Sequence, residues 1–185
     1  MAHSRRCCYW SYNQCCIDMT TGSLGLGLST AVGIALSKRV RKLPGYVYCI
    51  IGDGESQEGQ IWEAAMLAPQ FKVDNLIVFL DNNKQQVDGY TKDILDIEDI
   101  EAKFAAFNWH TQRIDGHDVA AIENAIAEAK KHVGVPSAIV LETVKGKGCG
   151  FAMNRTDNHD MRIDEDMLSS GMHDLKAIYK QFVEE

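Results

Sequence analysis

The chain has 185 residues, of which 45% are hydrophobic and 24% are charged, a composition typical of one globular domain with a sizeable core. Its formal net charge of -7 argues against a nucleic-acid partner, because a phosphate backbone requires a basic protein surface. No apolar run approaches the roughly 20 residues of a membrane-spanning helix, so we expect no membrane partner either.

The first sixteen residues differ from the rest of the chain. They carry two adjacent cysteine pairs, Cys7-Cys8 and Cys15-Cys16, at a spacing that zinc sites do not use. They also lack the apolar stretch of a secretory signal. We therefore expect an atypical, poorly ordered leader over 1–16 and a single domain over 17–185. Free thiols are typical of a reducing compartment, which favours a cytoplasmic location.

The chain after residue 17 alternates between two kinds of segment. Short apolar runs rich in β-branched residues, typical of buried strands, lie at 46–51, 75–80, 109–114 and 136–143. Stretches with helical periodicity or many small residues predict helices at 24–40, 58–70, 100–107, 119–132 and from Asp164 to about Phe182. Alternation of this kind predicts an α/β fold, a doubly wound parallel sheet with helices on both faces.

Acidic residues precede the last two predicted helices. Asp118, with His117 beside it, comes directly before the helix at 119–132, and Asp164 begins an acidic run at the start of the last helix. Side chains at such positions accept hydrogen bonds from the free amides of the first helical turn. We expect Asp118 and His117 to cap the first of these helices, with contact to a substrate as the alternative for His117, and the last helix to carry one apolar face.

Two polar turns directly follow predicted strands. Gly52-Asp53-Gly54-Glu55 comes after the strand at 46–51, and Asp81-Asn82-Asn83-Lys84-Gln85 comes after the strand at 75–80. Ligands of open parallel sheets bind beyond the carboxyl ends of the strands. One helix separates the two turns, so they belong to one βαβ unit. We therefore expect them to lie side by side at the same edge of the sheet.

The side chains of these turns suit a divalent cation and a diphosphate. Asp53 and Asn83 offer a carboxylate and an amide oxygen, the hard ligands that Mg²⁺ prefers. The flanking glycines let the backbone approach a diphosphate, and helix N-terminal amides favour its charge. Either turn alone has a simpler explanation, because Gly, Asp and Asn are common turn residues. The pair, each member following a buried strand, favours a ligand site.

Longer stretches of the sequence resemble a known family. The Gly-Asp-Gly and Asn-Asn turns are similar to the motif of thiamine diphosphate enzymes, and the chain from about residue 17 to about residue 159 resembles the N-terminal, diphosphate-binding section of transketolase, particularly the form made as two subunits. The stretches that carry the likeness are TTGSLGLGLSTAVGIAL (20–36), GDGESQEGQIWEAAMLA (52–68), NLIVFLDNNKQQVDG (75–89), IDGHD (114–118) and TVKGKG (143–148). The resemblance implies the thiamine diphosphate-binding fold, with thiamine diphosphate and Mg²⁺ as cofactors.

The resemblance also implies roles for individual residues. The metal would be held by the side chains of Asp53 and Asn83 and by the backbone carbonyl of Gln85. The glycine-rich turn at 22–24 would face the aminopyrimidine, and Val87 would press on the thiazolium. The full set of implied cofactor-binding residues is Gly22, Ser23, Leu24, Gly52, Asp53, Gly54, Glu55, Asn83 and Val87.

Two further residues are implied as catalytic. Glu58 matches an acid near the family's subunit interface, and His159 falls where the family has a histidine that reaches cofactor and substrate. The neighbours of His159, Asp157-Asn158-His159-Asp160, depart from the family's Trp-His-Gly. Structural explanations also exist: Glu58 suits the first turn of a helix, His159 suits a polar loop, and Leu24 and Val87 suit a core.

The family's site contains parts that this sequence does not match. The family has histidines upstream of the position of Thr20, and a pyrimidine-binding domain whose glutamate activates the cofactor. The nineteen residues before Thr20 do not resemble that upstream region. We therefore expect a partner, a C-terminal transketolase subunit that carries the pyrimidine-binding domain, in a dimer of heterodimers.

The reaction implied is transfer of a two-carbon ketol unit between sugar phosphates, as in the pentose phosphate pathway. Two alternatives stay open. One is another thiamine diphosphate enzyme, either a 2-oxoacid dehydrogenase component or a deoxyxylulose-phosphate synthase, although the segment QEGQIWEAA (57–65) favours transketolase. The other is a non-catalytic fragment that binds only cofactor or a partner, which the unmatched upstream histidines would support.

Overall fold

A parallel sheet forms the centre of the molecule, as the alternating pattern predicted. The structure is a computed structural model and describes residues 18–183. The strands of the sheet lie in the order β1-β2-β6-β5, and every neighbouring pair is parallel. Their bounds are β1 (Val47–Gly52), β2 (Leu76–Asn82), β5 (His110–Asp115) and β6 (Ser137–Glu142). All carboxyl ends therefore meet at one edge of the sheet.

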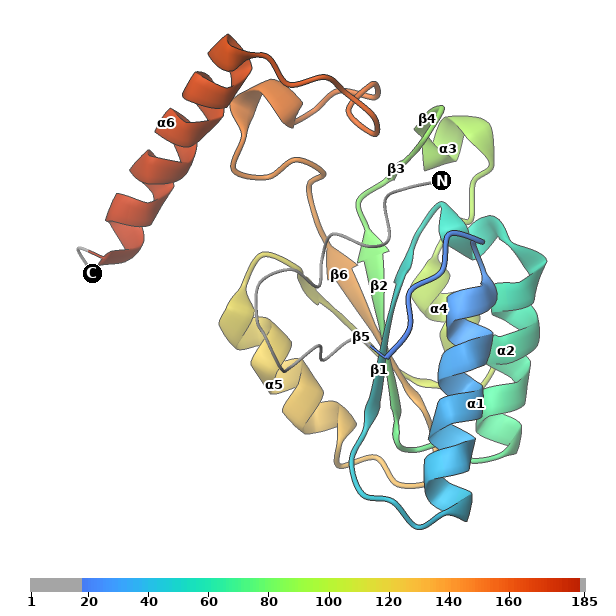
Figure 1. The fold of residues 1–185 in the computed structure, drawn as a ribbon. Helices are drawn as coiled ribbons and strands as arrows, with labels where there is room; N and C mark the ends of the chain where they lie inside the picture. Colours follow the sequence, from blue (N-terminus) through green and yellow to red (C-terminus); the bar gives the residue numbers. More distant parts are fainter. Residues whose placement is uncertain (1–17, 184–185) are drawn as a thin grey trace.

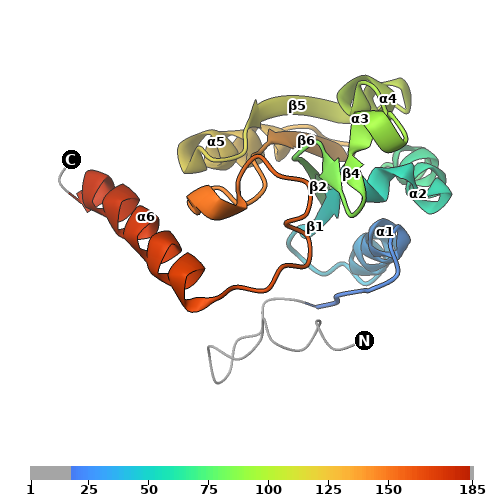
Figure 2. The same ribbon diagram turned by 90° about the horizontal axis from the view of Figure 1, so that it is seen from above.

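Helices cover both faces of this sheet (Figures 1 and 2), which confirms the predicted doubly wound α/β fold. One face carries α1 (Leu26–Val40), α2 (Gly59–Gln70) and α4 (Ile100–Ala106), and the other carries α5 (Val119–Ala129). Shorter elements connect them at the carboxyl edge: η1 (Glu55–Gln57), the hairpin of β3 (Gln85–Gln86) and β4 (Gly89–Tyr90), and α3 (Thr91–Ile94). The sequence pattern did not predict the hairpin or α3.

The larger core lies between the sheet and the three helices of the first face. Its largest fully buried members include Leu28 of α1, Ile51 of β1, Ile61 of α2 and Phe104 of α4. Burying side chains of this size stabilises the fold by about 1.5–3 kcal/mol each relative to exposure. Trp109 joins the same cluster, and its indole N–H donates to the backbone oxygen of Ala65 at 2.8 Å. This packing fixes the positions of the strands, and therefore of their carboxyl ends.

The second face is covered less completely. Alternation along β1 sends Cys49 and Ile51 into the larger core, whereas Tyr48 and Ile50 point to the other side, where they are 48% and 74% exposed. The core on that side is small and lies under α5. Burial, followed by the charge of Glu55, raises the pKa of the Cys49 thiol to about 11, so this thiol stays protonated and unreactive at neutral pH.

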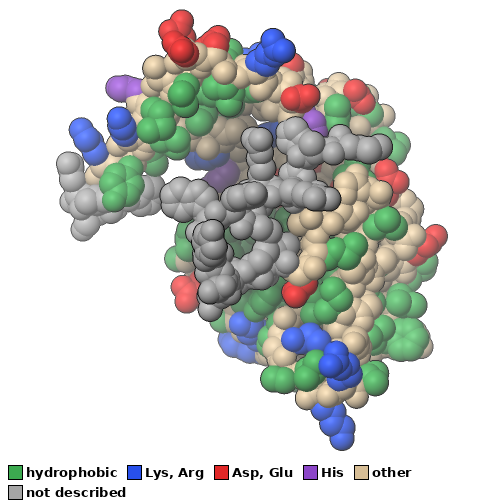
Figure 3. Space-filling model, in the orientation of Figure 1, with side chains coloured by type: hydrophobic (Ala, Val, Ile, Leu, Met, Phe, Trp, Pro, Cys, Tyr) green, Lys and Arg blue, Asp and Glu red, His purple; other side chains and the backbone are tan. Residues whose placement is uncertain are grey.

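The predicted last helix is present as α6 (Glu165–Val183), after a short η2 turn (Gly150–Ala152). It stands apart from the sheet in both ribbon views and contacts η2 (Figures 1 and 2). Asp164 caps it by accepting from the Met167 amide at 2.8 Å. Its apolar residues Leu168, Met172 and Leu175 are about half exposed, and apolar side chains gather along this helix in the space-filling view (Figure 3).

Three sequence predictions have different outcomes here. The leader at 1–16 lies outside the described residues, so that prediction stays untested. Asp118 caps α5 as expected, with its carboxylate accepting from the amides of Ala120 and Ala121. The prediction that His117 shares this role is wrong: its ring nitrogen Nε2 instead accepts from the Val144 amide at 2.8 Å, across to the loop after β6.

Within residues 18–183, every helix is too short or too polar to cross a membrane.

Candidate functional site

The two polar turns lie side by side, as predicted. β1 and β2 are parallel neighbours, and Gly52 is paired with Asp81 at the last step of their register. The Asp53 amide extends this pairing by donating to the Asp81 carbonyl at 3.1 Å. The turn after β1 and the turn after β2 are therefore joined through their backbones at the carboxyl edge of the sheet.

Asp53 is almost completely buried between these turns, with 2% exposure. One carboxylate oxygen accepts from the Gly54 amide at 2.7 Å and the other from the Lys84 amide at 2.5 Å. Burial raises the pKa of Asp53, those two hydrogen bonds oppose the rise, and the neighbouring Asp81 carboxylate adds to it. Within residues 18–183 Asp53 has no ion-pair partner, and the Lys84 ammonium, which lowers its pKa, acts on it without direct contact.

Asn83 is held by partners on both sides of its amide. The Nδ2 group donates to Asp81 Oδ2 at 2.9 Å, and Oδ1 accepts from the Gln85 amide at 2.9 Å. Gln85 itself is 9% exposed, and its side-chain oxygen is buried without a hydrogen-bond partner in the described part of the chain. A buried, unpaired oxygen carries a cost of about 1–3 kcal/mol. The second turn thus carries a buried polar oxygen that no described protein group satisfies.

Gly54 is needed because the two turns touch. A Cβ at this position would lie 2.8 Å from the Cβ of Gln86, closer than two side chains can approach. The side-chain amide of Gln57 crosses the same gap and donates to Gln86 Oε1 at 2.5 Å. Gly54 therefore lets Gln86 pack directly against the backbone of the first turn.

The glycine-rich turn at 22–24 lies against the turn after β1. Glu55 joins them, because its carboxylate accepts from the Gly25 amide at 3.0 Å and from the Gly52 amide at 3.2 Å. Gly25 has a positive φ of 83°, and a Cβ there would lie 2.9 Å from the Cβ of Glu58. Both conditions require glycine at this position. Direct contact between Glu55 and the cofactor stays a prediction, since both its oxygens already serve backbone amides.

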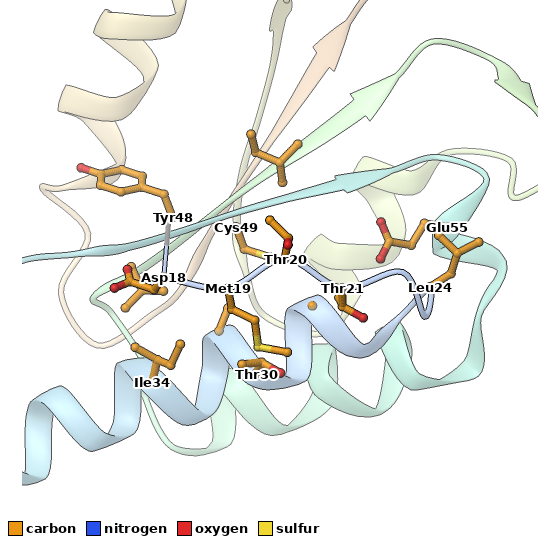
Figure 4. A pocket seen from close by; sticks show the side chains of 14 residues that line it. Asp18, Met19, Thr20, Thr21, Leu24, Thr30, Ile34, Tyr48, Cys49 and Glu55 are labelled. Carbon is orange, nitrogen blue, oxygen red and sulfur yellow. The ribbon is translucent and has the colours of Figure 1, made fainter. Parts of the chain in front are cut away.

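A pocket of about 440 Å³ opens beside this junction. Residues 18–21 form one wall, and Tyr48 and Cys49 of β1 form another, with Leu24 and Glu55 at one end (Figure 4). The lining is mostly apolar, with the carboxylate of Glu55 as a polar group at that end. The pocket therefore extends from the glycine-rich turn along the outer strand of the sheet.

The remaining predicted site residues are exposed in this chain. Leu24 is 58% exposed and Val87 is 59% exposed, so the alternative that they are ordinary core residues is wrong. Glu58 is the exposed N-cap residue of α2, and its side chain makes no capping hydrogen bond. These three side chains come from different elements around the joined turns, and each has room to contact a ligand or a second protein surface.

His159 lies on the long loop that leads from β6 to α6. It is exposed, and its Nδ1 lies 3.3 Å from Nζ of Lys145. Lys145 belongs to the segment TVKGKG, which leaves β6 at the carboxyl edge. Within the described residues, this contact to Lys145 is the hydrogen bond that holds the His159 side chain. The structure thus does not bring His159 into the hydrogen-bonded group around Asp53.

Sequence reasoning missed a supporting network beneath the second turn. Glu142 of β6 accepts from Asn82 Nδ2 at 2.7 Å and pairs with Arg113 and, at 3.4 Å, with Lys84. Partial burial opposes ionisation of Glu142, but the hydrogen bonds from Asn82 and Arg113 prevail and lower its pKa. The sequence contains a signal for this network, because a glutamate ends an otherwise apolar strand. That position lies at the same edge of the sheet as the polar turn after β2.

The fold and the site together define a class of protein. A parallel α/β sheet with polar turns after adjacent strands, one of them rich in glycine, is typical of a domain that binds a ligand beyond its strand ends. The family described as "Transketolase, thiamine diphosphate binding domain" matches residues 9–181. The chain therefore belongs to the transketolase family, as its thiamine diphosphate-binding domain.

Known relatives agree with this assignment. The chain is 51% identical over 160 residues to the 6-deoxy-6-sulfo-D-fructose transketolase subunit of Clostridium sp. (strain MSTE9), covering 86% of this chain and 58% of the relative. It is 34% identical over 160 residues to an apulose-4-phosphate transketolase subunit of Actinobacillus succinogenes, with the same coverage of 86% and 58%. The chain thus spans somewhat more than half the length of these relatives.

A solved structure agrees in fold. Transketolase from Campylobacter jejuni superposes with a TM-score of 0.81 at 29% identity, covering 86% of this chain and 26% of that chain. The predicted resemblance to the N-terminal section of transketolase is therefore confirmed, as is the fold class. The matched region accounts for about a quarter of that longer protein, so the site described above corresponds to one part of a larger enzyme.

Proposed function

We propose that this chain is the diphosphate-binding subunit of a split transketolase, which transfers a two-carbon ketol unit between sugar phosphates. The observation that carries the proposal is that Asp53 and Asn83 lie on adjacent, hydrogen-bonded turns beyond a parallel sheet. Family membership supplies the cofactor class, thiamine diphosphate. The metal, the substrates and the partner are inferred from the residues themselves and from the relatives.

The residues around Asp53 fit Mg²⁺. A buried carboxylate without a cationic partner is stabilised by a divalent ion. Residues 18–183 contain no cluster of three or more His, Cys, Asp or Glu side chains that could hold a metal, which argues against an ion held by charged side chains alone. Mg²⁺ instead takes one or two carboxylates together with phosphate oxygens and waters. Asp53, Asn83 Oδ1 and the Gln85 carbonyl would then be its protein ligands.

The surrounding residues fit the rest of the cofactor. Gly54 allows the two turns to approach closely, and Glu55 holds the glycine-rich turn at 22–24 next to them. The exposed apolar side chains of Leu24 and Val87 provide surface against which an aromatic ring can pack. Burial of these two side chains by a ligand would stabilise the complex by about 25 cal/mol per Å² of apolar area.

The cofactor, this chain and the partner subunit would have different roles in the reaction. Bound thiamine diphosphate supplies the carbanion chemistry that carries a two-carbon unit. The residues of this chain hold the diphosphate end, orient the ring through the turn at 22–24 and exclude water with Leu24 and Val87. The complementary C-terminal subunit would supply the pyrimidine-binding domain, and Glu58 lies exposed where a second protein surface can reach it. We infer a dimer of heterodimers in the cytoplasm.

The relatives guide the choice of substrate. The two named above are subunits whose names specify 6-deoxy-6-sulfo-D-fructose and apulose 4-phosphate. Both compounds carry an anionic group at the end of a sugar. Lys145, which is partly exposed, and His159, which is exposed, lie together at the carboxyl edge, so they are candidates to receive such a group. We therefore place the substrate among ketoses with a terminal phosphate or sulfonate.

A reconstitution assay tests this function. The chain is mixed with a C-terminal transketolase subunit, thiamine diphosphate and Mg²⁺, and offered fructose 6-phosphate, 6-deoxy-6-sulfo-D-fructose or pyruvate as donor, with an aldose phosphate as acceptor. We expect ketol transfer from a sugar donor only in the complete mixture. Turnover of pyruvate would instead favour the other thiamine enzymes. Cofactor binding without turnover of any donor would favour a non-catalytic role, and full activity of the chain alone would refute the split site.

A further inference from the structure

Asp81 connects the two halves of the proposed metal site. Its backbone carbonyl accepts from the Asp53 amide at 3.1 Å. Its side-chain oxygen Oδ2 accepts from Asn83 Nδ2 at 2.9 Å. The negative charge of Asp81 also acts on Asp53, because the ends of β1 and β2 are in contact there. Asp81 is thus bonded to both residues whose side chains the proposed function assigns to the metal.

The bond to Asn83 matters because a side-chain amide has two unlike ends. Its oxygen can bind a cation, whereas its NH₂ group carries hydrogens and cannot. Rotation by 180° exchanges them with little change in shape, so the hydrogen-bond partners decide which end faces the metal. Here a carboxylate takes the NH₂ end and a backbone N–H takes the oxygen end. The reversed amide would place NH₂ against the Gln85 N–H and oxygen against the Asp81 carboxylate.

Asp81 is itself fixed from the next strand. Its second oxygen, Oδ1, accepts from the Thr143 hydroxyl, just beyond β6. Thr143 packs tightly on Gly116, where an added Cβ would overlap the Thr143 methyl carbon. The carboxylate of Asp81 therefore has one oxygen occupied by Thr143 and the other by Asn83. Both oxygens serve protein donors, which is the arrangement of a supporting residue.

We propose that Asp81 is a positioning residue, which orients the Asn83 amide so that its oxygen faces the metal and which is supported in turn by Thr143. This inference rests on the proposed function, because it assumes that Asn83 is a ligand. Residues that orient metal ligands commonly contribute about 10- to 100-fold to metal affinity. The effect of Asp81 is on the ligand's orientation and requires a hydrogen-bond acceptor, not a negative charge.

The requirement for an acceptor separates two substitutions. In Asp81→Asn, the amide oxygen can still accept from Asn83, and the Thr143 hydroxyl can rotate to accept from the new NH₂ group. In Asp81→Leu, which has similar volume, no acceptor remains. Thr143→Val keeps the shape of the side chain and removes only the hydroxyl. Asp93→Leu makes the same exchange at an exposed position of α3 and serves as the control.

Mn²⁺ binding provides the affinity measurement. Free Mn²⁺ is followed by electron paramagnetic resonance as it is titrated into the full chain with saturating thiamine diphosphate. We expect Asp81→Leu to weaken Mn²⁺ binding by about 10- to 100-fold, Asp81→Asn and Thr143→Val to weaken it by less than about 10-fold, and Asp93→Leu to match the original chain. An equal loss in Asp81→Asn and Asp81→Leu would show that charge matters, and would overturn the proposal.

A spectroscopic measurement keeps the test independent of metal binding. The side-chain ¹⁵N–¹H signals of Asn83, assigned by their disappearance in Asn83→Asp, report directly on its hydrogen bond to Asp81. We expect one Asn83 NH₂ proton to shift in Asp81→Leu towards the position of a free amide, and to stay in Asp93→Leu. Unchanged Asn83 signals and unchanged Mn²⁺ affinity in a folded Asp81→Leu chain would overturn the proposal alone. Failure of the original chain to bind Mn²⁺ would overturn it together with the proposed metal site.

Discussion

Two regions of this molecule were predicted to serve the same ligand, and they are built differently. At the ends of β1 and β2, the polar side chains of Asp53 and Asn83 are each held by two hydrogen bonds to other residues of the two joined turns. On the loop between β6 and α6, His159 is exposed and is held by a contact to Lys145, which is itself partly exposed. The first region is positioned by the sheet, and the second by a long loop.

This difference indicates which half of the site is built to be rigid before a ligand arrives. A parallel sheet fixes the spacing of its strand ends, so side chains one or two residues beyond them inherit that order. A loop side chain with few contacts has to lose conformational freedom when it binds, at a cost of order 1–2 kcal/mol. Substitutions at the strand ends should therefore affect cofactor binding, whereas substitutions on the loop should affect substrate binding and turnover.

The largest effect is expected from Asp53→Ala. This change removes the one buried carboxylate of the proposed metal site, and we expect Mg²⁺-dependent binding of thiamine diphosphate to be abolished in calorimetry. The matched control is Glu63→Ala, an exposed position of α2, which should bind as the original chain does. Unchanged cofactor affinity in Asp53→Ala would break the assignment of the metal to the strand ends.

A smaller effect is expected from Gly54→Ala. The added methyl group would lie 2.8 Å from the Gln86 Cβ, so the two turns must separate, at a cost of about 1–3 kcal/mol in the free energy of unfolding. Gly33→Ala is the control, because its position in α1 has open space, and a helical Gly to Ala change stabilises by about 0.5–1 kcal/mol. Chemical denaturation should give shifts of opposite sign, and equal shifts would show that the turns do not need close contact.

Glu55→Gln should cost less. Glutamine keeps one acceptor oxygen, so one of the two amides now held by Glu55, of Gly25 or Gly52, loses its partner at a cost of about 1 kcal/mol. Hydrogen exchange of at least one of the Gly25 and Gly52 amides should become faster. In Glu58→Gln, an exposed neighbour, these amides should exchange as before. Unchanged exchange in Glu55→Gln would contradict its role as the link between the turns.

The smallest effect on the isolated chain is expected from His159→Ala. An exposed loop residue of this kind changes stability by less than about 0.5 kcal/mol, and Mg²⁺-dependent cofactor binding should be unaltered. In the reconstituted enzyme, however, we expect a raised KM for the sugar donor. Loss of cofactor binding in the isolated chain would show that the loop and the strand ends form one rigid unit, contrary to the comparison above.

The sequence predicted the strand ends well because several local signals agreed there. The buried runs ending at Ile51 and Leu80 gave the strands, and the polar residues beyond them could lie only at one edge. Asp81, Thr143 and Glu142 were missed because their roles depend on contacts between β2 and β6, which are 60 or more residues apart. The glutamate that ends the apolar strand is a local signal, but the partners of these residues depend on the pairing of distant strands, which leaves no local pattern in the sequence.

The same reasoning explains the errors elsewhere. His117 was assigned to the helix cap from its neighbour Asp118, but its ring bonds to Val144, 27 residues away. The amphipathic pattern of α6 predicted a helix correctly, yet its apolar side chains stay half exposed instead of packing on the sheet. Periodicity reports which face of a helix is apolar. It does not report which surface covers that face.

The most direct test is diffraction from crystals grown with thiamine diphosphate and Mn²⁺, using the anomalous signal of manganese. We predict a single strong peak in contact with the Asp53 carboxylate, Asn83 Oδ1 and the Gln85 carbonyl, bridging them to the diphosphate of the cofactor. A cofactor bound with its metal elsewhere, or Asp53 and Asn83 facing separate pockets, would contradict this.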